Sequence, residues 1–201
     1  MTKQNKDVKT PEEELPASEQ RLISLYDWLH SIISSVVIVI LLFVLCLRQI
    51  SVDGTSMVPT LHHTDRVLVS NVLYTPKNGD VVIIKTNFWG DIPIVKRVIA
   101  VGGQTIDINF DTHEVFVDGV LLDEPYINEP TAVQESFTGP VTVPEGCVFV
   151  MGDNRNHSSD SRDNRLGVVD VRNILGKVLL IIVPSKDDAT GGRDWRRVGK
   201  P

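Results

Sequence analysis

One long apolar run dominates the hydropathy pattern near the start of the chain. Residues 28–47 contain no aspartate, glutamate, lysine or arginine, and most positions from Ile32 onward are aliphatic. About 20 residues of α-helix span about 30 Å, the thickness of the hydrocarbon core of a bilayer. In lipid the backbone must satisfy its own hydrogen bonds, which favours a helix. The pattern therefore predicts one transmembrane helix over residues 26–48, with Tyr26 and Trp28 as interfacial aromatic residues and Arg48 at the other end.

A cleaved signal peptide, a buried core helix and a re-entrant segment are the alternatives to a transmembrane helix. A signal peptide would have small residues after its apolar region, whereas Arg48-Gln49-Ile50 follows this run. A helix that is apolar on every face is rare in a small domain, and a re-entrant segment is usually shorter. Lysine and arginine are nearly balanced on the two sides, so the positive-inside rule leaves the orientation open.

The region after the apolar run alternates short β-branched segments with turn signals. The pair Asp118-Gly119 between two such segments is typical of a two-residue hairpin turn. Many short strands without a βαβ rhythm predict an all-β, antiparallel, barrel-like domain over residues 49–184. Residues 1–25 and 185–201 are polar and are expected to be flexible tails. Strands are predicted at residues 66–72, 80–85, 94–101, 105–110, 114–117, 120–122, 146–151 and 176–183.

Composition and charge narrow the classes of function. The chain has 201 residues, of which 42% are hydrophobic and 23% charged, as in a folded domain with an appendage. Its net charge of −6 provides no basic field for a nucleic acid. Two cysteines exclude a disulfide framework and a multi-cysteine metal site. The adjacent side chains of His62 and His63 would point apart, so a zinc site is poorly supported, and we expect no metal and no cofactor.

Lys96 and Arg97 interrupt the apolar strand segment 94–101, one on each face of the strand. Arginine keeps its proton in proteins, so Arg97 needs an acidic partner. Lysine can lose its proton, because desolvation favours the neutral amine, which is a general base or a nucleophile. Lowering a lysine pKa from about 10.4 to about 7.5 requires about 4 kcal/mol. On residue type alone, a lysine that extends its amine to solvent is the commoner outcome.

Ser56 lies in a segment that favours a tight turn. Gly54 permits unusual backbone angles and Pro59 restricts the backbone that follows. A serine held in such a turn presents its hydroxyl and its N–H in one direction, as a nucleophile beside an oxyanion site requires. Taken alone, Ser56 is interpreted as an ordinary turn serine, which is the commoner outcome for such a residue.

A polar loop from Gly152 to Arg165 follows directly after an apolar strand segment. Such a loop costs conformational entropy unless its side chains bond one another. A solvated surface loop and a calcium-binding loop are the alternatives. Three arginines disfavour the calcium loop, namely Arg155, Arg162 and Arg165.

Together these segments resemble the bacterial type I signal peptidases, which are membrane-bound serine proteases with a Ser–Lys dyad. The resemblance covers roughly residues 25–184, and four blocks behind a membrane helix in family order make it specific. The blocks are Gly54-Thr55-Ser56-Met57-Val58-Pro59-Thr60-Leu61, Gly79-Asp80-Val81-Val82, Lys96-Arg97-Val98-Ile99-Ala100, and Gly152-Asp153-Asn154-Arg155 continuing to Ser158-Ser159-Asp160-Ser161-Arg162.

The resemblance implies a role for each matching residue. Ser56 corresponds to the nucleophile and donates its N–H to the oxyanion hole, and Lys96 corresponds to the general base. Ser158 corresponds to a hydroxyl that orients the lysine amine. The implied supporting pairs are Asp160 with Arg162 and Asp153 with Arg97, and the implied walls of the pockets for an Ala-x-Ala cleavage site are Val52, Met57, Leu61, Ile94 and Val95.

The resemblance also implies partners and orientation. The partners are secretory preproteins at the membrane surface and the lipid bilayer, with an N-terminus in the cytoplasm and an extracytoplasmic catalytic domain. Phe88 and Trp89 suit a membrane contact or partial burial in the core. Some family members have a serine in place of Gly54, and this serine supplies a second donor to the oxyanion hole. The sequence therefore leaves open which group, if any, is the second donor here. A glycine at this position resembles the Gram-positive branch of the family.

Three rival functions remain at this point. A self-cleaving, repressor-like Ser–Lys protease would carry a DNA-binding domain where this chain has its apolar run. A membrane-tethered β-domain that binds a partner would not need Ser56 or Lys96. An inactive family member is disfavoured because all dyad and supporting positions are present.

Overall fold

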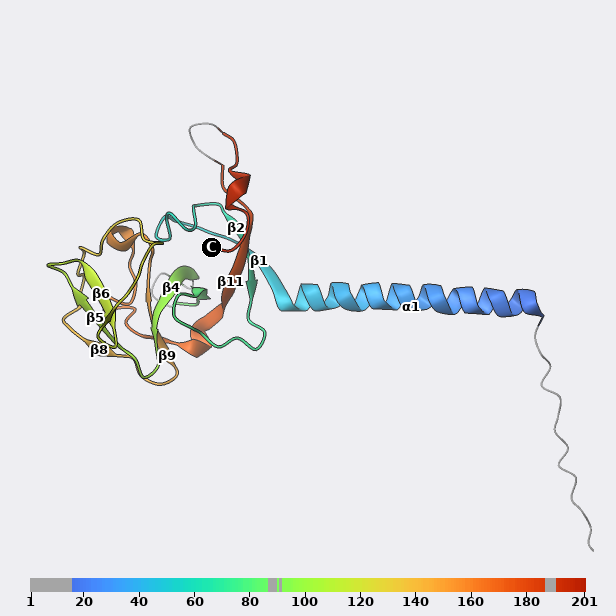
Figure 1. Ribbon diagram of the computed structural model, residues 1–201, viewed down its shortest axis with the longest axis horizontal. Helices are drawn as coiled ribbons and strands as arrows, with labels where there is room; N and C mark the ends of the chain where they lie inside the picture. Colours follow the sequence, from blue (N-terminus) through green and yellow to red (C-terminus); the bar gives the residue numbers. More distant parts are fainter. Residues whose placement is uncertain (1–15, 87–89, 91, 187–190) are drawn as a thin grey trace, which may run out of the picture. The chain divides into compact units, whose positions relative to one another are not determined.

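The computed structural model of the chain describes residues 16–86, 90, 92–186 and 191–201 (Figure 1). Its internal contacts divide the chain between Leu45 and Cys46. Helix α1 (Ala17–Cys46) accounts for the described part of the first unit. The second unit, residues 46–201, is called the β domain below.

Helix α1 contains residues 28–46 of the predicted apolar run, but its bounds differ from residues 26–48. It begins at Ala17, and it ends before Arg48 because Leu47 and Arg48 pair with strand residues Ser70 and Val69. Its stretch Ser18–Leu41 is long and apolar enough to cross a membrane. The hydroxyls of Ser31 and Ser35 donate to carbonyls one turn earlier, at 2.8 and 2.7 Å. The helix therefore satisfies these two polar side chains internally, as lipid requires.

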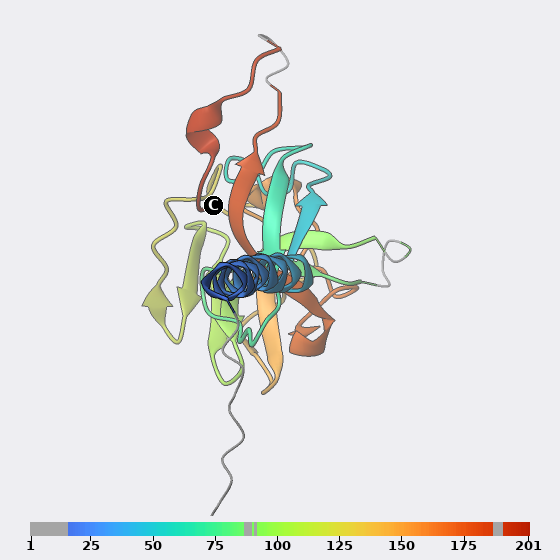
Figure 2. The same cartoon turned by 90° about the vertical axis from the view of Figure 1, so that its right-hand side faces the viewer.

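The larger sheet of the β domain has seven strands in the order β1-β2-β11-β3-β4-β9-β10. Every pairing in it is antiparallel. Figure 2 shows β1, β2 and β11 side by side. The bounds are β1 Leu47–Ser51, β2 Arg66–Ser70, β3 Val81–Ile84, β4 Ile94–Val101, β9 Cys147–Met151, β10 Val169–Asp170 and β11 Ile174–Val183.

The smaller sheet has four antiparallel strands in the order β7-β6-β5-β8. The predicted hairpin turn is confirmed, because Val117 pairs with Val120 and both turn residues have positive φ angles, +54° at Asp118 and +76° at Gly119. The bounds are β5 Thr105–Asn109, β6 Glu114–Val117, β7 Val120–Leu121 and β8 Val141–Thr142.

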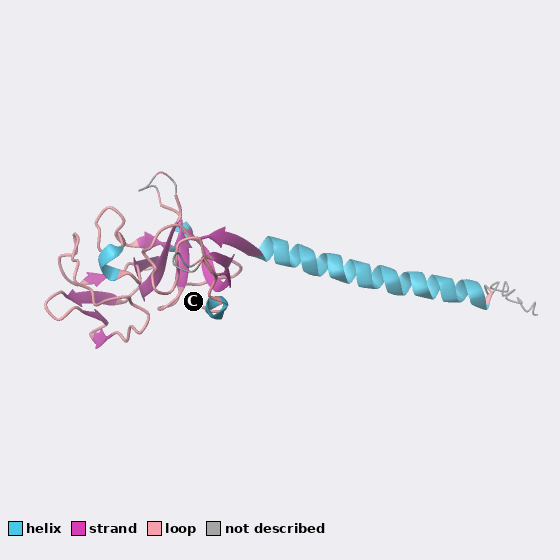
Figure 3. Cartoon of the chain, turned by 90° about the horizontal axis from the view of Figure 1, so that it is seen from above, coloured by secondary structure: helices cyan, strands magenta, loops and turns pink. Residues whose placement is uncertain are grey.

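The predicted fold class, an all-β antiparallel domain with one apolar N-terminal helix, is confirmed. Helical segments in the described part of the β domain are short 3₁₀ turns, as Figure 3 shows: η1 (Arg155–His157), η2 (Val171–Asn173) and η3 (Trp195–Arg197). Strands β1, β8 and β10 are not predicted from the sequence. Two of them contain two residues each, and β1 follows the apolar run with no turn signal between them.

The described residues 191–201, called the C-terminal segment below, contact the rest of the β domain, although their composition predicts a flexible tail. Backbone bridges join Ile181 to Gly199 and Lys186 to Arg193. An ion pair links Arg197 to the buried carboxylate of Asp65. Polar and charged groups make these contacts, so hydropathy gives no sign of them.

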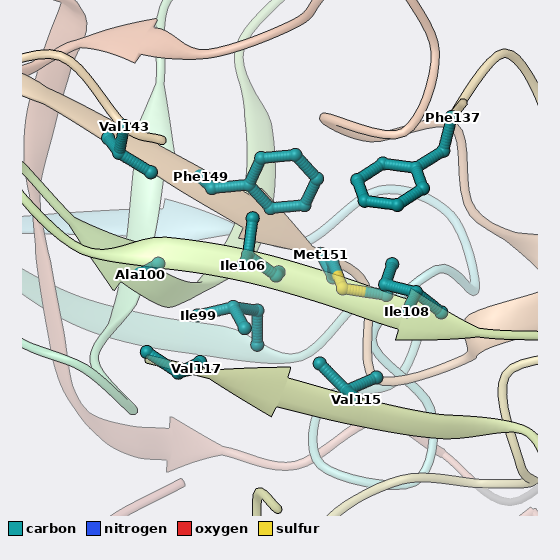
Figure 4. Packing of buried hydrophobic residues seen from close by; sticks show 10 residues of the cluster. All are labelled: Ile99, Ala100, Ile106, Ile108, Val115, Val117, Phe137, Val143, Phe149 and Met151. Carbon is teal, nitrogen blue, oxygen red and sulfur yellow. The ribbon is translucent and has the colours of Figure 1, made fainter. Parts of the chain in front are cut away.

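A buried apolar cluster holds the two sheets together and fixes β4 and β9 in place (Figure 4). The rings of Phe137 and Phe149 meet edge to face, with centroids 6.0 Å apart and an interplanar angle of 84°. Strand β4 carries Lys96, and β9 leads directly into the polar loop. The cluster consists of Ile99, Ala100, Ile106, Ile108, Val115, Val117, Phe137, Val143, Phe149 and Met151.

Candidate active site

Ser56 and Lys96 lie 40 positions apart in the chain and meet in the structure. The distance from Lys96 Nζ to Ser56 Oγ is 2.8 Å, and Nζ also donates to the Val95 carbonyl at 3.1 Å. Only 4% of Lys96 is exposed. Burial lowers its pKa from 10.5 to about 8, against the opposing attraction of Asp160 and Asp153. A neutral amine at this place can accept the proton of the Ser56 hydroxyl.

The β3–β4 register places Lys96 and Arg97 on opposite faces of the sheet. Lys96 lies opposite Val82 and Arg97 opposite Val81. The one-cation-per-face arrangement expected from the sequence is therefore present, and the two side chains reach different partners.

A tight turn over residues 54–61, called the Ser56 turn below, presents the serine. Its N–H groups bond within the turn, from Val58 to the Thr55 carbonyl at 3.1 Å and from Leu61 to the Met57 carbonyl at 2.8 Å. Gly54 begins the turn with a φ of +95°, which favours glycine, and its N–H donates to His63 Nδ1 at 3.2 Å. The Gly54 N–H therefore already has an acceptor. We accordingly assign no second oxyanion donor to Gly54.

Asn154 of the polar loop donates hydrogen bonds to the backbone carbonyls of Thr55 and Ser56. Its backbone N–H donates to the Ser56 carbonyl at 3.0 Å, and its side-chain Nδ2 donates to the Thr55 carbonyl at 3.1 Å. Sequence reasoning included Asn154 in the last block but gave it no role. Because the two partners are about a hundred positions away in the chain, no local pattern identifies this contact.

Gly152 allows the polar loop to pass against the Ser56 turn. A Cβ atom on Gly152 would lie 2.2 Å from Ser158 Oγ and 2.5 Å from the Ser56 carbonyl oxygen. Ser158 is thus close to the Ser56 backbone and is itself buried. Its hydroxyl has no hydrogen-bond partner among the described residues, so the expected bond to the Lys96 amine is not formed here.

Asp160 and Arg162 form a fully buried ion pair in the polar loop. Arg162 Nε and Nη2 each lie 2.9 Å from one carboxylate oxygen of Asp160. Asp160 also accepts the Gly152 N–H at 3.0 Å. The implied pair is therefore present and fixes the backbone at Gly152.

Arg97 and Asp153 form a second buried ion pair, and its contacts join all four blocks of the sequence. Arg97 Nε and Nη2 donate to the two carboxylate oxygens of Asp153 at 2.8 and 2.7 Å. Arg97 also donates to the Gly79 carbonyl at 2.8 Å and lies 4.1 Å from the ring centre of Tyr126. The Thr60 hydroxyl donates to Asp153 at 2.5 Å. Asp153 therefore ties the Ser56 turn to β4 and the polar loop.

Four of the five expected pocket residues lie together. Val52, Met57 and Leu61 are buried in one apolar cluster, and Val95 packs against it. Ile94 instead packs against a separate cluster that includes Val82 and Val98.

Other contacts of the site carry no signal in the sequence. Arg155 is fully buried and bonds both carboxylate oxygens of Glu124 and the hydroxyl of Thr131. The contacts of Thr60 with Asp153 and of Tyr126 with Arg97 were likewise not predicted from the sequence.

Phe88 and Trp89, considered for membrane contact, lie outside the described residues. Within the described ranges, no group of three His, Cys, Asp or Glu side chains is arranged to hold a metal ion.

Comparison with known proteins identifies the family. Residues 25–183 match the family described as signal peptidase, peptidase S26. The chain belongs to the peptidase S26 family of signal peptidases. The resemblance and the prediction of a signal peptidase, a serine peptidase and hydrolase, are confirmed.

Individual relatives of this S26 chain are bacterial. It is 40% identical over 171 residues to the signal peptidase I of Bacillus licheniformis, covering 80% of this chain and 90% of the relative. It is 36% identical over 172 residues to the signal peptidase I S of Bacillus subtilis (strain 168), with the same coverage. A crystal structure of a signal peptidase I from Enterococcus faecalis V583 aligns with a TM-score of 0.44 and 28% identity, covering 52% of this chain and 97% of that chain.

The close approach at Gly152 predicts that Gly152→Ala lowers cleavage of a signal-peptide substrate by about 100-fold, the order expected when reacting groups shift by about 1 Å. The added methyl group overlaps Ser158 Oγ and the Ser56 carbonyl, so one of them must move. The measurement is the cleavage rate of a preprotein by the folded, detergent-solubilised chain.

Gly102→Ala is the matched control. Its Cβ would meet Glu145 at 3.0–3.1 Å, which a shift of a few tenths of an ångström relieves, and it lies in another turn. A rate for Gly152→Ala equal to that of Gly102→Ala would show that the contact at Gly152 does not position the site.

Proposed function

We propose that this chain is a membrane-anchored serine endopeptidase that removes N-terminal signal peptides from exported preproteins by a Ser–Lys mechanism. The observation that carries the proposal is the 2.8 Å contact between Ser56 Oγ and the buried amine of Lys96. Membership of the signal peptidase family supports the substrate class.

Lys96 acts as the general base in the proposed reaction. The neutral amine takes the proton of Ser56 as Oγ attacks the scissile carbonyl carbon. The Ser56 N–H donates to the oxygen that becomes negative. Lys96 then gives its proton to the leaving nitrogen, the new N-terminus of the mature protein. Water, deprotonated in turn by Lys96, attacks the acyl-enzyme. The bond between the acyl carbon and Ser56 Oγ breaks, Lys96 returns the proton to Oγ, and the signal peptide leaves with a free carboxylate.

The lowered pKa makes this base available near neutral pH. A pKa of about 8 leaves about a quarter of the amines neutral at pH 7.5, against about one in a thousand for an unperturbed lysine. The shift corresponds to about 3 kcal/mol of differential interaction, which burial of the amine supplies.

The surrounding polar residues act through position and charge. Arg97 pairs with Asp153 and Arg162 pairs with Asp160, the two carboxylates whose attraction most opposes deprotonation of Lys96. We assign Ser158 the role of orienting the amine, because its buried hydroxyl has no hydrogen-bond partner among the described residues and lies beside Gly152 and the Ser56 backbone.

Small side chains before the scissile bond fit the apolar surroundings of Ser56. Val52, Met57, Leu61 and Val95 form one apolar cluster that includes the residue following Ser56. Apolar walls with little room favour alanine over larger or charged residues. We therefore propose cleavage after an Ala-x-Ala type of site, with Ile94 contributing less because it packs in another cluster.

The apolar helix is proposed to anchor the enzyme with its N-terminus in the cytoplasm. The Ser18–Leu41 stretch is long enough to span the bilayer once. Exported preproteins present their cleavage sites on the outer side, so the β domain is placed there.

We predict that Ser56→Ala and Lys96→Ala each abolish cleavage of a detergent-solubilised preprotein by the full chain. Lys96→Arg is also expected to be inactive, because a guanidinium keeps its proton and cannot act as the base. Mass spectrometry of the products and sequencing of the new N-terminus measure the outcome. Retention of cleavage by Ser56→Ala would contradict the proposal.

The same assay tests specificity with a second substrate, in which leucine replaces the alanines one and three positions before the cleavage site. The apolar cluster predicts at least tenfold slower cleavage of this substrate, since a pocket discriminates by about 1–3 kcal/mol for a small change in side-chain size. Equal rates for the two substrates would exclude small-residue pockets.

The pKa of Lys96 predicts the pH dependence of cleavage. The neutral form is active, so kcat/KM rises about tenfold per pH unit at low pH and levels off above a pKa of about 8. Rates between pH 6 and 10 measure the profile, with circular dichroism confirming that the chain stays folded. A flat profile, or one that still rises steeply at pH 10, would contradict a desolvated lysine base.

A further inference from the structure

Arg197 lies beyond residue 183, where the family match ends, yet its side chain reaches the Ser56 turn. It belongs to the short helix η3 (Trp195–Arg197) of the C-terminal segment. Its Nη2 donates to Asp65 Oδ2 at 2.6 Å and to the Thr60 carbonyl at 3.3 Å, and its Nη1 donates to Asp65 Oδ1 at 3.2 Å. The guanidinium thus holds a carboxylate and the end of the turn at once.

Asp65 is the point where three segments meet. Its carboxylate is fully buried and accepts the N–H groups of His62 at 2.8 Å and Ser185 at 2.6 Å as well as the arginine. Burial raises the pKa of Asp65, but the Arg197 side chain and the two backbone donors outweigh burial and lower the pKa overall. The carboxylate is therefore ionised, and loss of Arg197 would leave a buried negative charge without its cation.

Thr60 connects this pair to the catalytic residues. The Thr60 carbonyl accepts a hydrogen bond from Arg197, and the Thr60 hydroxyl donates one to Asp153 at 2.5 Å. Asp153 in turn binds Arg97, the neighbour of Lys96 on β4. The far end of the Ser56 turn is thus fixed from two sides.

We propose that Arg197 is a positioning residue for the reaction: by binding Asp65 and the Thr60 carbonyl, it holds the Ser56 turn where Ser56 Oγ reaches Lys96 Nζ. The inference rests on the proposed Ser–Lys mechanism. Arg197 acts through the turn: within the described residues its guanidinium donates to Asp65, Ser185 and the Thr60 carbonyl, and not to Ser56 or Lys96.

The backbone delivers Arg197 to this place. The Ile181 N–H donates to the Gly199 carbonyl at 2.7 Å, and the Gly199 N–H returns a bond at 3.2 Å. Asp194 caps η3, the short helix that carries Arg197, because its side chain accepts the Arg196 N–H at 3.1 Å. The Arg196 side chain is 91% exposed and pairs with Asp194 at the surface, so it provides a matched control of the same residue type.

The test compares Arg197→Ala, Arg197→Lys and Arg196→Ala in the detergent-solubilised full chain. kcat and KM are measured on a preprotein substrate at a temperature where circular dichroism shows each variant folded. Arg197→Ala is expected to lower kcat by about 10- to 100-fold with KM unchanged within about twofold. Arg197→Lys should recover part of the loss, because an ammonium keeps the charge but not the two-pronged contact. Arg196→Ala should match the wild type.

A wild-type kcat in folded Arg197→Ala overturns the proposal, even if its melting temperature falls, because the arginine would then be structural only. A raised KM with unchanged kcat also overturns it. If Arg197→Ala does not fold, Arg197→Lys decides: reduced kcat in the folded variant supports positioning, and wild-type kcat contradicts it.

Ser56→Ala and Lys96→Ala in the same assay separate the two proposals. If both are inactive while Arg197→Ala is fully active, the positioning role alone fails. If Ser56→Ala or Lys96→Ala cleaves like the wild type, the Ser–Lys mechanism fails, and the positioning proposal is overturned with it.

Discussion

Desolvation of the Lys96 amine is the constraint on which the rest of the site depends. An exposed lysine is protonated at neutral pH and cannot accept a proton from serine. Burial leaves only 4% of Lys96 exposed and lowers the pKa of its amine to about 8. Two nearby carboxylates, Asp160 and Asp153, raise the pKa of Lys96 against this burial, and each is paired with an arginine. The buried ion pairs therefore have a chemical consequence as well as a structural one, since they limit how strongly these acids stabilise the ammonium form.

Local patterns made much of the fold predictable. The Asp118-Gly119 turn has the residues that its backbone angles require, and β4 is the segment 94–101 predicted from its β-branched residues. The alternation of Lys96 and Arg97 gives one cation per face, because side chains alternate along any strand. Strands as short as β8 and β10 have no such pattern, since neighbours in space rather than sequence determine them.

The site was predictable as a set of residues but not as a network. The family blocks identify Ser56 and Lys96, and the need of a buried arginine for an acid anticipates a partner for Arg97. The bonds from Asn154 to the Ser56 turn and from Arg197 to Asp65 join positions about a hundred or more residues apart. These long-range polar contacts follow from the tertiary fold, and no periodicity in the sequence encodes them. For the same reason a polar C-terminal segment has the composition of a tail and yet binds the β domain.

The most direct test of this account is the titration of the Lys96 amine itself. Lysine labelled with carbon-13 at Cε allows nuclear magnetic resonance to follow each amine in the detergent-solubilised chain, and Lys96→Arg assigns the signal by its loss. The account predicts that the Lys96 signal titrates with a midpoint of about 8, well below the ordinary lysine value of 10.5. A midpoint near 10.5, the ordinary value for lysine, would show that the amine is charged at neutral pH and would contradict its role as the base.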